Sequence, residues 1–128
     1  SYEKALVIEP NNALVLNNYA YYLSVRNLEL NRAEKMSKKS NILDENNAAY
    51  QDTYAWIMYQ KGDYNEALKW MEKAIISAGD DSSAEMYDHN GYILLKLNQK
   101  DKAIKNWEKS LEIDSNRKET TQKIQQHK

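Results

Sequence analysis

Apolar and polar residues alternate along this chain at the spacing of helices rather than strands. In each segment the apolar positions recur every three or four residues, as Leu16, Tyr19, Ala20 and Leu23 do in the first long one. Such a stripe predicts an amphipathic helix whose apolar side faces a neighbour. The helices expected on this basis cover residues 14–26, 30–43, 47–60, 64–77, 82–97 and 101–113.

The chain also repeats itself. Residues 17–21, 52–56 and 88–92 are variants of one short sequence, and they begin 35 and 36 residues apart. An alanine, at position 33, 67 or 103, follows each variant at nearly the same distance. A fixed period of this length is typical of stacked units, each made of the same few helices.

Turn-forming residues separate the expected helices at regular places. Gly62 lies between two of them, and Asn98 occupies the equivalent place one repeat later, so both are expected to adopt a positive φ. Residues 9–12, 44–47 and 114–116 form equivalent joints rich in Asn, Asp and Pro, which end one helix and cap the next. The joint at residues 78–82 is longer, which explains the 36-residue spacing there.

Small residues recur where the two helices of a unit would cross. Ala20, Ala55 and Gly91 hold this place in the three repeats, and they allow two helices to approach to about 8–10 Å. We therefore expect an all-α solenoid (α-solenoid) of stacked antiparallel helix hairpins. The expected single domain divides into a half repeat (1–10), three repeats (12–46, 47–81 and 82–115) and a polar capping helix or tail (116–128).

One repeat carries residues that identify a family. Tyr54-Ala55, Gly62-Asp63-Tyr64, Ala67-Leu68, Met71 and Ala74-Ile75 resemble a tetratricopeptide repeat of the bacterial type. The first repeat departs from this pattern by one extra residue within residues 25–29. The resemblance implies a right-handed α-solenoid. It also implies a protein–protein interaction module without catalytic activity, which would be part of a larger scaffold or assembly protein. The opening half repeat similarly suggests a fragment of a longer array.

Composition excludes several classes of function. The formal net charge is −1, with 18 basic and 19 acidic residues interspersed, so the chain lacks the concentrated positive charge that nucleic acid binding needs. No apolar run approaches the ~20 residues needed to cross a bilayer, which argues against direct membrane insertion. There is no cysteine, no phosphate-binding glycine loop and no nucleophile motif. We expect no enzyme activity, no catalytic residue and no cofactor.

The residues that differ between repeats carry the candidate site. The resemblance implies that the first helix of each repeat lines a concave groove. Positions four apart share one helix face, so three pairs and one further ring are expected to bind a partner segment: Asn17 and Tyr21, Asp52 and Trp56, Asp88 and Tyr92, with Tyr59. Ser24 and Leu95 would continue this strip. The alternative is that the rings pack between repeats while the acidic residues cap helices or face solvent.

The expected partner is a protein or peptide with apolar and basic residues. One subclass of the family uses Lys, Arg and Asn to grip acidic C-terminal tails, but this strip offers Asp52 and Asp88 instead. Self-association through an exposed N-terminal edge is the alternative. His89 beside Asp80 and Asp81 is too small a set to predict a metal site. The sequence leaves the compartment open between the cytoplasm and the bacterial cell envelope.

Overall fold

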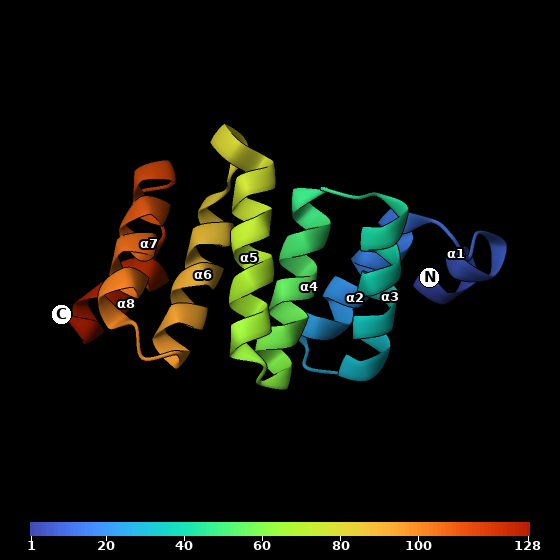
Figure 1. Cartoon of the computed structure of the whole chain (residues 1–128), viewed down its shortest axis with the longest axis horizontal. Coiled ribbons are helices and arrows are strands. Elements are labelled where there is room, and N and C mark those ends of the chain that lie inside the picture. The colour runs from blue at the N-terminus through green and yellow to red at the C-terminus, as the bar shows by residue number, and fades with distance from the viewer.

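The computed structural model describes residues 1–128 as a row of α-helices with one short 3-10 turn and no strand (Figure 1). Every helix predicted from the apolar spacing is present. The elements are α1 (Tyr2–Ile8), α2 (Ala13–Val25), α3 (Leu30–Leu43), α4 (Ala48–Lys61), α5 (Tyr64–Ala78), η1 (Gly79–Asp81), α6 (Ala84–Lys96), α7 (Lys100–Ile113) and α8 (Lys118–His127).

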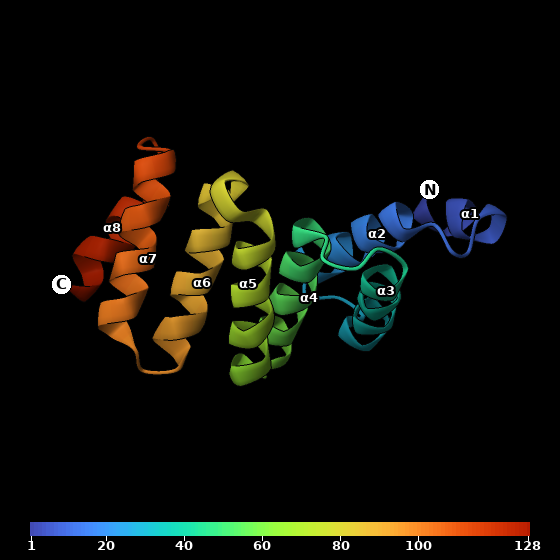
Figure 2. The same cartoon turned by 45° about the horizontal axis from the view of Figure 1, so that its top comes forward.

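The helices form three antiparallel hairpins, α2–α3, α4–α5 and α6–α7, which stack side by side along the long axis (Figures 1 and 2). Ala20 and Ala55 are completely buried, and Gly91 is buried at the equivalent crossing. The alanines of the second helices, at positions 33, 67 and 103, are also completely buried. The predicted role of small residues in close helix packing is therefore confirmed.

The first helices of successive hairpins lie closer together than the second helices do. α2 contacts α4, and α4 contacts α6, whereas no comparable packing joins α3 to α5 or α5 to α7. A stack that is tighter on one side curves toward that side. The α2, α4 and α6 helices consequently form the inner side of the curve, and α3, α5 and α7 form the outer side.

The turns follow the chemistry of their residues. Gly62 has a φ of 88° and Asn98 a φ of 60°, as predicted. Asp63 follows Gly62 and caps α5, because its carboxylate accepts a hydrogen bond from the Glu66 backbone N–H. The longer first turn instead forces Glu29 into the left-handed region with a φ of 43°.

The joints between hairpins use side-chain caps only in part. Asn12 and Asn47 accept hydrogen bonds from the first turns of α2 and α4, as expected. At the third joint the expectation is wrong: α8 begins after Arg117, which makes no side-chain cap. Residues 114–116 cannot take the cap position of α8, because Arg117 stands between them and the first residue of the helix.

The C-terminal segment is a helix packed on the last hairpin. α8 contacts α7 and buries Thr120 and Ile124. Ile124 joins Leu94, Ala103 and the fully buried Trp107 in a small core separate from the main one. The main core runs through the first two hairpins into α6 and holds 15 buried residues. None of the helices is both long and apolar enough to span a membrane.

Candidate functional site

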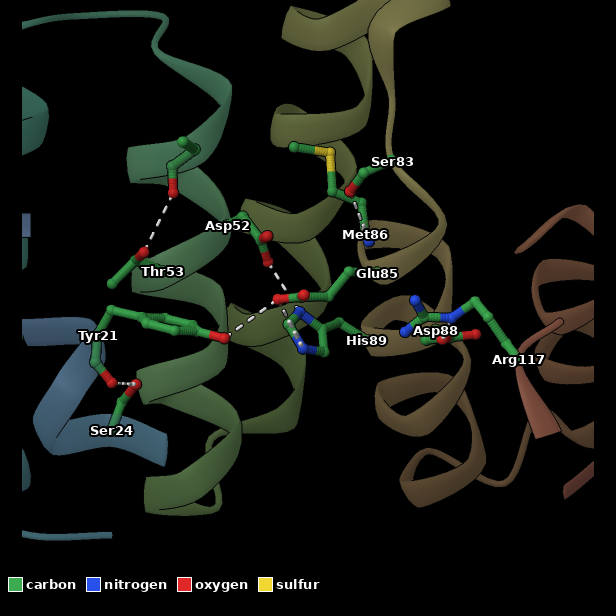
Figure 3. A network of polar contacts seen from close by, with 11 residues as sticks. Tyr21, Ser24, Asp52, Thr53, Ser83, Glu85, Met86, Asp88, His89 and Arg117 are labelled. Atoms are coloured by element: carbon green, nitrogen blue, oxygen red, sulfur yellow. Dashed lines mark hydrogen bonds and ion pairs between the residues drawn. The ribbon is translucent and has the colours of Figure 1, made fainter. Parts of the chain in front are cut away.

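Side chains from three different hairpins meet on the inner side of the curve. Tyr21 comes from α2, Asp52 from α4, and Glu85 and His89 from α6, and their polar ends point toward one another (Figure 3). Glu85 and His89 are four residues apart and share a face of α6. We call the surface formed by α2, α4 and α6 the inner face.

His89 is the centre of this polar group. Its Nδ1 lies 3.0 Å from Asp52 Oδ1, and its Nε2 lies 3.7 Å from Glu85 Oε1. The side chains of His89 and Asp52 are 11% and 15% exposed, whereas that of Glu85 is 47% exposed. The imidazole is thus held between two carboxylates, one partly buried and one open to solvent.

Tyr21 extends the group toward α2. Its hydroxyl donates a hydrogen bond to Glu85 Oε1 at 3.2 Å. Burial of the hydroxyl end and the nearby carboxylates of Glu85 and Asp52 raise the pKa of Tyr21 to about 12. The phenol therefore remains a hydrogen-bond donor at neutral pH. Its bond to Glu85 joins the first hairpin to the third, and the contact between His89 and Asp52 joins the third to the second.

Aromatic rings surround the polar group. The Trp56 ring stacks on the His89 imidazole with centroids 4.1 Å apart, and on Tyr59 at 4.5 Å. Tyr59 in turn contacts Tyr64 at 5.6 Å, and Tyr92 lies 6.4 Å from Trp56. Trp56, Tyr59 and Tyr92 are half-buried, so each ring packs against its neighbours and still presents surface to solvent.

Two of the predicted site residues, Asp88 and Asn17, are buried. Asp88 is 5% exposed, and its carboxylate accepts hydrogen bonds from Arg117 at 2.7 Å and from Thr120 at 2.9 Å. Asn17 is also buried, and its Oδ1 has no hydrogen-bond partner. Ser24 was expected on the strip, but it is fully buried and donates to the Tyr21 carbonyl oxygen.

Sequence reasoning missed Glu85. It lies three residues before Asp88 and has no counterpart in the repeated sequence, so the repeat pattern gave no reason to select it. The i,i+4 spacing of Glu85 and His89 was the available signal. In the structure His89 lies beside Asp52 and Glu85 rather than beside Asp80 or Asp81.

A hollow lies on the outer side and is lined by residues of α3, α4 and α5. It has a volume of about 580 Å³, and Trp70 and Ile42 line its sides. Gln51 and Tyr54 from α4 also line it, and the Oε1 of Gln51 is buried without a hydrogen-bond partner. Trp70 donates a hydrogen bond to Glu66, and the ammonium group of Lys73 lies over its ring. Both the indole N–H and one face of the ring therefore already have partners within the chain.

Comparison with known proteins agrees with this architecture. The family model for the tetratricopeptide repeat matches residues 48–77 and 84–117. The chain belongs to the tetratricopeptide repeat family. A repeat-containing protein of Pseudomonas aeruginosa is 30% identical over 67 residues, which are 52% of this chain and 11% of that protein. The chain therefore spans about a tenth of this relative. The bacterial source of the relative is consistent with the bacterial type of repeat expected from the sequence.

Solved structures of the family superpose on nearly the whole chain. YrrB, described as a tetratricopeptide protein with an unusual peptide-binding site, is 26% identical with a TM-score of 0.81, covering 97% of this chain and 62% of YrrB. MamA is 24% identical with a TM-score of 0.80, covering 96% of this chain and 70% of MamA. The first repeat domain of Spaghetti (RPAP3), bound to the HSP90 peptide SRMEEVD, is 19% identical with a TM-score of 0.80, covering 89% of this chain and 88% of that domain.

These likenesses show the fold of a helical-repeat solenoid. The family and the fold are generally those of interaction modules without catalytic activity. Membership of this family supports a role for the chain in protein–protein interaction.

Proposed function

We propose that the chain binds a segment of a partner protein on its inner face, as the interaction module of a larger scaffold or assembly protein. The observation that carries this proposal is the half-exposed aromatic run of Trp56, Tyr59 and Tyr92, which crosses from α4 to α6. Aromatic anchors supply much of the energy of protein interfaces. Rings already packed against one another also lose little entropy on binding.

The inner face divides into contact residues and supporting residues. We assign direct contact with the partner to Tyr21, Trp56, Tyr59, Tyr92 and Asp52, which all keep exposed surface. Asn17 and Asp88 are buried, so we assign them no direct contact; Asp88 instead holds α8 through Arg117 and Thr120.

The charge of the inner face favours a basic partner. Arg117 neutralises Asp88, whereas no lysine or arginine forms an ion pair with Asp52 or Glu85. The peptide SRMEEVD in the RPAP3 structure has three acidic residues. Two carboxylates on this face would repel such a peptide, so a segment with apolar residues and Lys or Arg fits better.

Selection from a displayed peptide library tests this proposal. Peptides that bind the chain are expected to be rich in apolar and basic residues. Trp56→Ala combined with Tyr59→Ala should weaken their binding at least tenfold, because truncating an anchor costs about 2 kcal/mol or more. Trp70→Ala, which removes the same kind of ring from the outer side, should leave binding unchanged.

The controls make the result decisive. Circular dichroism should show the same helix content in all variants before affinities are compared. If the selected peptides bind the Trp56→Ala, Tyr59→Ala variant as tightly as the original chain, the inner face is not the binding site. Loss of binding in Trp70→Ala alone would move the site to the outer side.

Self-association through α1 is the second candidate function. Val7 and Ile8 are 83% and 80% exposed, and α1 buries no residue of its own. A second copy of the chain could cover this apolar edge, since exposed apolar surface favours association. Sedimentation velocity at two concentrations a hundredfold apart tests it. A monomer at both concentrations contradicts self-association, and a dimer that Val7→Lys with Ile8→Lys abolishes supports it.

A further inference from the structure

We propose that Asp52, Glu85 and His89 form a binding site for a divalent transition-metal ion such as Zn²⁺. One donor atom from each of the three residues lies within 4.8 Å of the other two. The residues come from two hairpins, α4 and α6, so an ion held by them would also join consecutive repeats. Nothing in the repeat sequence assigns this role, because Glu85 lies outside the repeated positions.

One side chain has to turn before all three residues can share one ion. Bonds of about 2.0–2.2 Å to a tetrahedral Zn²⁺ place its ligand atoms roughly 3.4 Å apart. The observed separations from the imidazole are 3.0 Å to Asp52 and 3.7 Å to Glu85, on opposite ring nitrogens. The least movement keeps Asp52 at Nδ1 and rotates Glu85, the most exposed of the three side chains, toward the same ion (Figure 3).

The imidazole is held in place before any ion arrives, whereas Glu85 has to turn toward it. Trp56 stacks on the imidazole with an interplanar angle of 20°, which limits rotation of the ring. The Tyr21 hydroxyl bonds to Glu85 and would orient this carboxylate from outside the metal shell, as second-shell groups do in metal sites. Preorganised ligands lose less entropy when the ion binds.

The ligand set selects the class of ion. An imidazole with two carboxylates suits Zn²⁺ and its transition-metal neighbours. Ca²⁺ needs about six to eight oxygen ligands and Mg²⁺ prefers an octahedron of oxygens, and three protein ligands including a nitrogen supply neither. Three protein ligands leave a fourth position free, which water or a side chain of a bound partner would fill.

The alternative to a metal site is an ion pair among the same three residues, with no ion bound. A protonated His89 between Asp52 and Glu85 would hold α4 to α6 without any metal. The two arrangements differ in their response to added ions, because an internal ion pair would give no saturable heat with Zn²⁺. This difference makes the site testable in the absence of any peptide, so the outcome is independent of partner binding.

Calorimetric titration of the chain with ZnCl₂, without a polyhistidine tag, tests the site. We expect one ion bound per chain, with affinity reduced about tenfold or more in His89→Gln. Glu85→Gln should weaken binding as well, and its exposed position keeps this variant folded if His89→Gln unfolds. His127→Gln removes the other histidine, which bonds only to the Lys123 carbonyl, and should change nothing.

Co²⁺ supplies an independent readout. A four- or five-coordinate Co²⁺ site with a nitrogen ligand absorbs in the visible range far more strongly than the octahedral aqueous ion. The band should appear with one equivalent of CoCl₂, disappear on addition of ZnCl₂ and be absent in His89→Gln. Absence of saturable Zn²⁺ binding, unchanged affinity in both His89→Gln and Glu85→Gln, or loss of binding in His127→Gln would overturn the proposal.

Discussion

The indole of Trp107 fills the space that a side chain at position 91 would occupy. A Cβ placed on Gly91 would lie 2.5 Å from Trp107 Cδ1 and 2.7 Å from Cε2, with Nε1 in closer overlap. Trp107 is fully buried, and its Nε1 donates to the Asp88 carbonyl oxygen, so the ring has no room to retreat. The glycine of the third repeat is thus matched to the tryptophan that packs against it.

Gly91→Ala should therefore destabilise the chain although alanine favours helix. Alanine gains about 1 kcal/mol of helix propensity, but overpacking a rigid ring costs about 1–3 kcal/mol. Because the added Cβ would overlap the buried indole, we expect the upper part of this cost and a net loss of about 1–2 kcal/mol in the free energy of unfolding, measured by urea denaturation. In a Trp107→Leu background the same substitution should be neutral or stabilising, and an equal loss in both backgrounds would contradict the match.

The sequence predicted the fold because each rule that sets it is local. Ala20, Ala55 and the turn residue Gly62 could be assigned from spacing and conformational preference alone, and the structure confirms them. The site depended instead on side chains brought together by stacking. Asp88 bonds to Arg117, and Tyr21 bonds to Glu85 across 64 residues of sequence. A repeat pattern specifies which face a residue occupies, but it does not specify which neighbour takes up its polar atoms.

Arg117 should control how firmly α8 is attached. Its guanidinium bonds to the buried carboxylate of Asp88, and hydrogen bonds to charged groups contribute about 1.5–3 kcal/mol. The Arg117 side chain is 34% exposed, so we expect the lower part of this range. In Arg117→Gln, hydrogen exchange should accelerate in α8 by about tenfold or more while α4 and α5 keep their protection. Uniform acceleration across all helices would show that α8 opens only with global unfolding.

Glu29 should be replaceable with a gain in stability. It adopts the left-handed conformation, which costs a residue with a Cβ about 1–2 kcal/mol and suits Asn better. Its ion pair with Arg32 is long, at 3.7 Å, and exposed, so little is lost with it. Glu29→Asn should raise the free energy of unfolding by about 0.5–1 kcal/mol in thermal or urea unfolding. Glu45→Asn, at an exposed turn position without positive φ, is the control and should show no gain.

Tyr21 should titrate late, because burial and the carboxylates beside it raise its pKa. Burial and the neighbouring carboxylates raise the pKa of Tyr21 from 10 in an open chain to about 12. The folded state thus favours the protonated phenol, and its contribution to stability is complete below pH 10 and lost as the pH rises from 10 to 12. Absorbance of tyrosinate in the ultraviolet follows this titration directly.

Two variants separate Tyr21 from the other tyrosines. Tyr54 also has a pKa raised to about 12, chiefly by burial, so the original chain should show at least two phenols that titrate late. Tyr21→Phe should remove one of them and should leave the Tyr54 signal in place. In Glu85→Gln the pKa of Tyr21 should fall toward 10, because the variant removes the charge that opposes ionisation while burial remains. An unchanged late titration in Glu85→Gln would mean that burial alone accounts for the shift, and that the link from α2 to α6 through these two side chains has no electrostatic weight.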